Sequence, residues 1–348
     1  MSATPPGTSR ADRWYERGTR YTWRPAAGPA AGRDVDIFHV EAGDPDADLV
    51  VLIHGWPTCS IDWFDVFDGL ARGYRVTALD VPGHGFSDKP PDWPYGLDVD
   101  AELVRHHITE VLGRDRCRIV AHDRGDSVAL ALVYQLTEDP DASGLTVEHL
   151  VLTNGNIYLP LASLTPFQEM LLDPNQAPAV VEAVTPEALA TGMGATTFTP
   201  RREEHDPTVA ALAATFAHDD GTAVLADTVK YLHERVEHEV EWLTALSRST
   251  LDTTLVWGLC DTIAPPRVVM HVWEHFVRSK PGSNELWFVP GADHYLQNDR
   301  PEALLAVVRA AFDRTGPSPP GPTTPLPVPS DAAVAPTGAS PIRVDHSH

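Results

Sequence analysis

The stretch CRIVAHDRGDSVALAL, residues 117–132, decides the fold of this chain. Its first five residues are typical of a buried β-strand, and the residues from Gly125 onward are typical of a helix. Small residues, Ala121 and Gly125, stand two positions before and two positions after Asp123. A tight strand-to-helix turn needs such small flanks, because larger side chains would collide there. The pattern therefore predicts a sharp turn that presents the Asp123 carboxylate.

Two other interpretations of this stretch remain open. Asp123 could be an ordinary N-cap, since aspartate is common at helix starts. The overlapping pattern GDSVA, residues 125–129, could instead present Ser127 as a nucleophile. That serine would lie a full turn inside the helix, however, because the apolar strand ends at Ala121 or His122. We therefore expect Asp123 at the turn, where a helix N-terminus favours a negative charge.

Strand-like and helix-like segments alternate along the chain. The run LVVLI at residues 49–53 is apolar enough to be buried on both faces, as in a parallel sheet covered by helices. We expect strands at residues 35–40, 49–53, 74–79, 117–121, 147–153, 254–258 and 285–289, and helices at about 61–72, 98–112, 125–137 and 301–313. This alternation predicts an α/β fold with a doubly wound, mostly parallel sheet.

An interval of about 100 residues, between Thr153 and Thr254, has helical patterns and no convincing strand. A helical insertion there would cover the carboxyl ends of the strands, where open α/β sheets bind ligands. We therefore expect a core of residues 20–154 and 250–313, with a helical cap of residues 155–249. Residues 1–19 are expected to form a flexible N-terminus, and the proline-rich residues 314–348 a disordered tail.

The composition limits the possible partners. The chain has 49 acidic residues and 26 lysines and arginines, and its net charge of −23 disfavours nucleic acid and anionic lipid. No apolar run approaches the roughly 20 residues of a membrane span, and the N-terminus has no apolar signal segment. Three widely spaced cysteines indicate neither a disulfide framework nor a zinc site. We expect a cytoplasmic monomer or homodimer that uses no metal or cofactor.

Further residues at the ends of predicted strands complete a candidate catalytic group. Trp56 follows the strand 49–53, where its backbone N–H can point at Asp123 and form an oxyanion hole with the backbone N–H of Arg124. His294, after the strand that ends at residue 289, is the candidate base. Asp261, after the strand 254–258, would orient that histidine.

Two neighbouring residues are weaker candidates for the acid that orients His294. Asp293 precedes the histidine directly, but adjacent residues on a loop usually point apart. Asn154, after the strand 147–153, cannot carry a charge. We therefore prefer Asp261, which gives the chain order nucleophile, acid, histidine.

Taken together, residues 20–313 resemble the α/β-hydrolase superfamily. Within it they are similar to the epoxide hydrolase and haloalkane dehalogenase branch, which uses an aspartate nucleophile. The resemblance is especially to the mesoderm-specific transcript homologues, in the stretches HGWPTCSIDW, ALDVPGHGFSDKP, AHDRGD, LTVEHLVLTNGNIY and DDGTAVLADTVKYLHERVEHEVEWLTAL. It implies a hydrolase that acts on a small apolar molecule. An ester would form on Asp123, and a water activated by His294 and Asp261 would hydrolyse it.

The resemblance does not settle the leaving group. Dehalogenases hold the halide with a Trp after the nucleophile and an Asn or second Trp, whereas Arg124 and Trp56 occupy those positions here. Fluoroacetate dehalogenases have a second arginine where this chain has Ser127. Epoxide hydrolases use two cap tyrosines as proton donors, and Tyr231 and Tyr158 are the candidates. We expect an epoxide hydrolase. A dehalogenase-like hydrolase, a serine esterase using Ser127 and a non-catalytic ligand-binding homologue are the alternatives.

Overall fold

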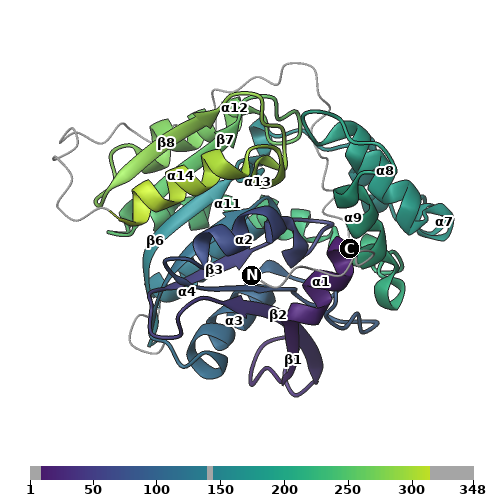
Figure 1. Cartoon of the computed structure of the whole chain (residues 1–348), viewed down its shortest axis with the longest axis horizontal. Helices are drawn as coiled ribbons and strands as arrows, with labels where there is room; N and C mark the ends of the chain where they lie inside the picture. Colours follow the sequence, from purple (N-terminus) through teal and green to yellow (C-terminus); the bar gives the residue numbers. More distant parts are fainter. Residues whose placement is uncertain (1–8, 139–143, 314–348) are drawn as a thin grey trace.

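The computed structural model describes residues 9–138 and 144–313. Within these ranges one eight-stranded sheet runs through the molecule, with helices on both of its faces (Figure 1). The proline-rich segment 314–348, expected to be a disordered tail, lies outside the described residues. In the described ranges we find no helix that is both long and apolar enough to span a lipid bilayer.

The strands agree with the expected segments to within about two residues, apart from an additional first strand. In chain order they are Gly18–Trp23 (β1), Val35–Ala42 (β2), Leu49–Ile53 (β3), Arg75–Leu79 (β4), Arg116–His122 (β5), Thr146–Thr153 (β6), Asp252–Gly258 (β7) and Asn284–Val289 (β8). Their order in the sheet is β1-β2-β4-β3-β5-β6-β7-β8. The pairs β1–β2 and β2–β4 are antiparallel, and the other pairs are parallel. The predicted α/β fold with a mostly parallel sheet is confirmed.

The position of β5 within the sheet determines where the candidate site lies. Ala121 of β5 is opposite Ile53 of β3, and His122 is opposite Thr153 of β6. These three parallel strands therefore end at the same edge of the sheet. The loops that follow them meet there, at the usual ligand-binding edge of an open α/β sheet.

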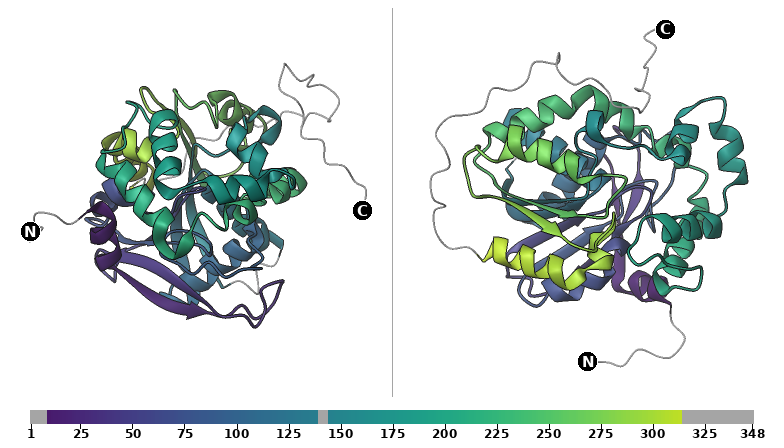
Figure 2. Two further views of the ribbon diagram at one scale, coloured as in Figure 1. Left: turned by 90° about the vertical axis from the view of Figure 1, so that its right-hand side faces the viewer. Right: turned by 90° about the horizontal axis from the view of Figure 1, so that it is seen from above.

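Helices cover the two faces of the sheet, which explains why all five residues of β3 are buried (Figure 2). On one face, α2 (Phe64–Leu70) packs against α14 (Pro301–Phe312), and on the other α3 (Leu97–His106) packs against α4 (Arg124–Glu138). The remaining core helices are short: η1 (Ser60–Trp63), η2 (His107–Val111), α12 (Pro266–Val272), η5 (Trp273–Val277) and α13 (Leu296–Asp299).

The expectation of a flexible N-terminus over residues 1–19 is wrong for the part that the structure describes. Residues Arg10–Arg17 form helix α1, and β1 begins at Gly18. A capping box starts the helix: the Ser9 hydroxyl accepts from the Asp12 backbone N–H, and the Asp12 carboxylate accepts from the Ser9 N–H. Such a box satisfies two backbone donors at once, which stabilises a short helix of otherwise polar composition.

The side chain of Trp14 fixes α1 to the core. Trp14 is fully buried against Phe64 and Phe67, and its indole Nε1 donates a hydrogen bond of 2.9 Å to the Ser60 hydroxyl. Burial of one large aromatic side chain helps to offset the entropy lost on ordering the helix. The composition of residues 1–19 does not indicate this contact.

Between β6 and β7 the described chain contains helices and no strand, as the sequence indicates. These helices are η3 (Leu159–Leu161), α6 (Pro166–Leu172), α7 (Ala177–Ala183), α8 (Pro186–Thr196), α9 (Pro207–Ala217), η4 (His218–Asp220), α10 (Leu225–Thr228) and α11 (Tyr231–Arg248). In Figure 1, α7, α8 and α9 lie to one side of the sheet, whereas α11 returns to pack against α4. We use the word cap for residues 155–249.

We expect the substitution Trp14→Ala to lower the free energy of unfolding by about 3–5 kcal/mol, because it leaves a cavity in the core. Chemical denaturation measures this change. Glu16→Ala, at an exposed position of the same helix, is the matched control and should change stability by less than about 0.5 kcal/mol. Equally small effects of both substitutions would show that α1 is not held by its buried tryptophan.

Candidate active site

Asp123 occupies a strained turn between β5 and α4. Its φ is 52°, in the left-handed region that residues other than glycine rarely adopt. A Cβ atom on Gly125 would lie 2.5 Å from the carbonyl oxygen of Ile53, which excludes a larger residue. Steric crowding therefore explains why the position two residues after Asp123 holds glycine. Backbone strain of this kind is concentrated at functional sites.

The Asp123 carboxylate is buried and is held from two sides. Its Oδ1 accepts a hydrogen bond of 2.9 Å from the backbone N–H of Trp56, and its Oδ2 lies 3.5 Å from Nε2 of His294. Gly55 permits this approach, because a Cβ there would lie 2.9 Å from the Cβ of Asp123. Arg124 begins α4, so its backbone N–H belongs to the helix N-terminus beside the same carboxylate.

The second ring nitrogen of His294 faces Asp261. The distance from Nδ1 to Asp261 Oδ2 is 3.0 Å. The other carboxylate oxygen accepts hydrogen bonds of 2.8 and 2.9 Å from the backbone N–H groups of Ile263 and Ala264. The structure thus brings Asp123, His294 and Asp261 together as a continuous buried series.

The two weaker acid candidates lie close by and make other contacts. Asp293 Oδ2 accepts a hydrogen bond of 2.7 Å from Arg201, and its Oδ1 accepts from the backbone N–H of His294. Its carboxylate therefore does not face the imidazole nitrogens. Asn154 Nδ2 donates to Asp261 Oδ2 at 2.6 Å. Asn154 thus holds the Asp261 carboxylate in place, a role that we did not foresee from the sequence.

Burial and neighbouring charges act on the pair in opposite directions. Burial alone would raise the pKa of Asp123, but the hydrogen bond and charge of His294 outweigh it and hold that pKa well below its usual range. Burial alone would lower the pKa of His294, but Asp261 and Asp123 raise it well above its usual value. At neutral pH the carboxylate is therefore ionised and the imidazole protonated.

A cavity of about 470 Å³ opens above these residues. Asp123, His294 and Trp56 line it from the core, and side chains of α6 and α8, such as Phe167 and Leu189, line it from the cap. A mainly apolar cavity of this size with a few convergent polar groups fits a small organic molecule. Among the described residues, no three side chains of the metal-binding types come together.

Ser127 lies inside α4 and does not line this cavity. Its hydroxyl accepts a hydrogen bond of 2.8 Å from Nε of Arg235, which comes from the cap helix α11. The guanidinium group of Arg235 and that of Arg124 both contact the ring of Tyr231, 5.0 and 5.2 Å from its centroid. Arg124 also forms a buried ion pair with Asp100. We missed Arg235 in the sequence, because a charged residue in an amphipathic helix is usually exposed.

The two candidate tyrosines occupy different surroundings. Tyr231 is buried close enough to Asp123 that the carboxylate adds to the effect of burial in raising its pKa. The ring of Tyr158 stacks on His271 with a centroid distance of 4.1 Å, outside the lining of the cavity. A third tyrosine, Tyr295, does line the cavity, and burial raises its pKa. We missed it because we sought proton donors only in the cap.

The family profile for the alpha/beta hydrolase fold matches residues 48–301, so the chain belongs to that family and to the hydrolase superfamily. It is 30% identical over 297 residues to the Mycobacterium tuberculosis protein LipZ, covering 85% of this chain and 96% of that protein. It is 26% identical over 292 residues to the mouse mesoderm-specific transcript protein, covering 82% of this chain and 85% of that protein.

Solved structures with the same fold include enzymes of more than one kind. The epoxide hydrolase CorEH matches with a TM-score of 0.64 and 19% identity, over 85% of this chain and 98% of that one. The haloalkane dehalogenase AncHLD2 matches with a TM-score of 0.64 and 21% identity, over 79% of this chain and 94% of that one. Identities this low establish the fold alone.

Replacing Asp261 with Asn should lower the pKa of His294, because the Asp261 charge is the largest of the contributions that raise it. An NMR titration of the imidazole measures this pKa. Asp293→Asn removes a carboxylate that does not face the ring, so in this control variant the pKa should stay higher than in Asp261→Asn. Equal pKa values in the two variants would contradict the observed geometry.

The same interaction links stability to pH. The folded-state pKa of His294 lies above its unfolded value of about 6.5, so the stabilisation is complete below that pH and is lost as the pH rises through the folded-state pKa. We expect the difference in melting temperature between the wild type and Asp261→Asn to be larger at pH 6 than at alkaline pH. A difference in melting temperature that increases with pH would contradict the predicted direction of the pH dependence.

Proposed function

We propose that this protein is an epoxide hydrolase that works through a covalent ester on Asp123. Oδ2 of Asp123 attacks an epoxide carbon, the ring C–O bond breaks, and the released oxygen takes a proton from a tyrosine hydroxyl. One observation carries the proposal: an ionised carboxylate lies between the Trp56 N–H and His294 at a largely apolar cavity. Aspartate suits this reaction because attack at its own carbonyl carbon regenerates the carboxylate.

In the second step, His294 takes a proton from a water molecule that attacks the ester carbonyl. Once Asp123 is esterified its negative charge is gone, and so is one contribution that keeps the pKa of His294 high. The imidazolium can then release its proton and act as a base, while Asp261 balances the charge that returns when water is deprotonated. The carbonyl oxygen of the ester, Oδ1, becomes the oxyanion, and the backbone nitrogen of Trp56 already lies 2.9 Å from it. Collapse of this intermediate breaks the ester bond, and the product alcohol takes its proton from His294.

The polar groups around Asp123 favour an epoxide over a halide. A halide needs N–H donors, but the indole N–H of Trp56 donates to the Thr228 hydroxyl of the cap at 3.0 Å. An epoxide needs a neutral proton donor, and Tyr231 and Tyr295 both lie near Asp123 with a pKa raised by burial. Of the three tyrosines only Tyr295 is among the residues that line the cavity, and neither Tyr231 nor Tyr158 is.

A serine esterase mechanism has less support. Ser127 Oγ is engaged by Arg235, whereas His294 faces Asp123. A base that is to activate a nucleophile must be within hydrogen-bonding reach of it. The contacts therefore favour Asp123 as the nucleophile.

The variant His294→Gln should trap the ester, because it retains the nucleophile and lacks the base that activates water. After incubation with styrene oxide, intact-mass spectrometry should detect protein heavier by one epoxide, and peptide mapping should place the adduct on Asp123. The double variant that also carries Asp123→Asn is the matched control and should remain unmodified. The absence of an adduct across a panel of epoxides and alkyl halides would favour the non-catalytic, ligand-binding alternative.

A second pair of variants separates the two possible nucleophiles. Asp123→Asn should abolish turnover of epoxides, whereas Ser127→Ala should retain it, since Ser127 does not line the cavity. Steady-state turnover on styrene oxide measures both variants. Ester hydrolysis that survives Asp123→Asn but is lost in Ser127→Ala would overturn the proposal in favour of the serine mechanism.

A further inference from the structure

A buried carboxyl group that the mechanism above does not use lies beside the catalytic pair. Asp62, in η1, is only 3% exposed. Its Oδ2 accepts a hydrogen bond of 2.6 Å from the Thr58 hydroxyl and a longer one of 3.4 Å from the Gly55 N–H. Because Gly55 directly precedes Trp56, Asp62 contacts the same loop that binds Asp123.

Thr58 connects this carboxyl group to the large cavity. Hydrogen bonding by Thr58 lowers the pKa of Tyr295 against the effect of burial, so the two side chains are near neighbours. Tyr295 lines the cavity together with Asp123 and His294. Three groups that can each hold and pass a proton therefore lead from Asp62 toward the place where an epoxide oxygen would lie.

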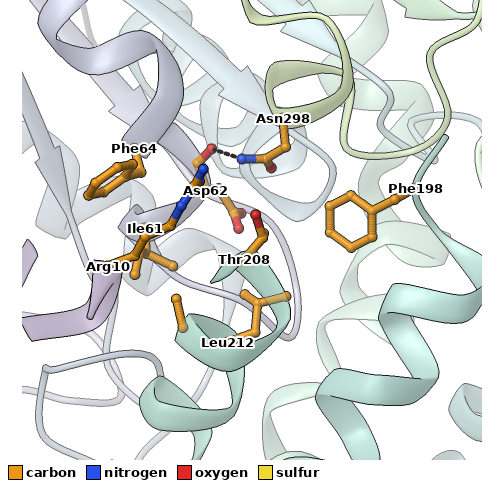
Figure 3. Close-up of a pocket in the computed structure, with 9 residues that line it drawn as sticks. Arg10, Ile61, Asp62, Phe64, Phe198, Thr208, Leu212 and Asn298 are labelled. Carbon is orange, nitrogen blue, oxygen red and sulfur yellow. Dashed lines mark hydrogen bonds between the residues drawn. The ribbon is translucent and has the colours of Figure 1, made fainter. Parts of the chain in front are cut away.

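Asp62 also lines a second, much smaller cavity, together with residues of α1, α9 and α13 (Figure 3). This cavity measures about 10 Å³, roughly the space that the centre of one water molecule requires. Arg10, Thr208 and Asn298 supply polar atoms to its lining. A water molecule there would give Asp62 a route for exchanging a proton while substrate fills the large cavity.

We propose that Asp62, Thr58 and Tyr295 form a proton relay in which Asp62 stores the proton for the leaving oxygen. This inference rests on the proposed function. As the epoxide C–O bond breaks, Tyr295 gives its hydroxyl proton to the released oxygen and takes one from Thr58. Thr58 is reprotonated by Asp62, which becomes a carboxylate.

The proton balance closes over one catalytic cycle. Opening the epoxide consumes one proton, which Asp62 supplies. Before hydrolysis of the ester, the His294 imidazolium releases one proton, and this proton restores Asp62. Hydrolysis then produces the diol and a protonated Asp123, which passes its proton to His294. The resting state is thus restored, and the net reaction is epoxide plus water to diol.

The charges around Asp62 are consistent with a stored proton. Burial raises the pKa of Asp62 to about 8, even though the hydrogen bonds from Thr58 and Gly55 lower it. The charge of Asp123 raises this pKa further, and the charge of His294 lowers it. Esterification removes the Asp123 charge, so Asp62 becomes a stronger acid during the step that needs its proton.

The other elements packed around Asp62 add no unpaired charge. Arg10 of α1 lines the small cavity, but its guanidinium group is paired with Asp65 at 2.9 Å. Asn298 of α13 donates to the backbone oxygen of Asp62, and Thr208 of α9 is uncharged. The charged groups that act on this carboxyl group are thus those of the catalytic pair.

The test measures ester formation alone, in the His294→Gln background, with styrene oxide and with an activated alkyl bromide. Opening an epoxide requires a proton, whereas a departing bromide does not. We expect D62N to slow the epoxide reaction by about 100-fold, within the range for loss of a general acid, and to leave the bromide reaction unchanged. D68N, at an exposed position of α2 whose carboxylate pairs with Arg17, is the matched control and should slow neither reaction.

Variants of Thr58 test the connection itself. T58S keeps a hydroxyl and should retain epoxide opening, whereas T58V should lose it to the same extent as D62N.

The wild-type rate of epoxide opening should fall as the pH rises through about 8, because Asp62 is then a carboxylate, and D62N should lack this fall. Equal slowing of the epoxide and bromide reactions by D62N would show that Asp62 only supports the loop, and it would overturn the relay. An unchanged epoxide rate in D62N would overturn it as well.

A measurement without substrate separates failure of the relay from failure of the proposed function. Infrared difference spectra between the wild type and D62N at pH 7 should contain the carbonyl band of a protonated carboxyl group, lost on titration near pH 8. If this band is absent, the relay is wrong even where epoxides are hydrolysed. If the band is present but His294→Gln forms no adduct with any epoxide, the proposed function is wrong.

Discussion

The buried negative charge of Asp123 is the constraint on which the rest of the site depends. Removing a carboxylate from water costs several kcal/mol unless hydrogen bonds and a partner charge compensate. The backbone N–H of Trp56 and the imidazole of His294 provide this compensation. These two groups belong to loops after β3 and after β8, so the order of the parallel strands brings distant parts of the sequence to one carboxylate.

The sequence allowed prediction of the residues that follow strands, because a strand end is a local pattern. Asp123, Asp261 and His294 each stand just after a short apolar run, and the structure places the three in contact. Helix α1 could not be predicted in this way. Its order depends on the burial of Trp14 against residues about 50 positions away, which no local pattern contains.

The site residues that the sequence did not predict share one property. They are of residue types that are usually exposed, yet they are buried. Arg235 is a charged residue of a helix, yet it is buried and donates to Ser127. Asp62 stands between Ile61 and Trp63 and is buried beside Thr58. Acidic and basic side chains are normally solvated, so residue type alone favours an exposed position for both. Only the packing of the cap and of η1 against the core reveals these contacts.

Neutralisation of a single charge connects the two halves of the proposed reaction. The structures of CorEH and AncHLD2 match this fold with the same TM-score of 0.64, so the fold cannot select the leaving group, and the groups around the nucleophile must do so. The Asp123 charge acts on His294 and on Asp62, and in each case it favours the protonated form. Ester formation removes that charge. His294 then loses its proton more readily and becomes a base for water, while Asp62 becomes a better donor for the leaving oxygen. Formation of one covalent bond would thus prepare the next proton transfer without any movement of the backbone.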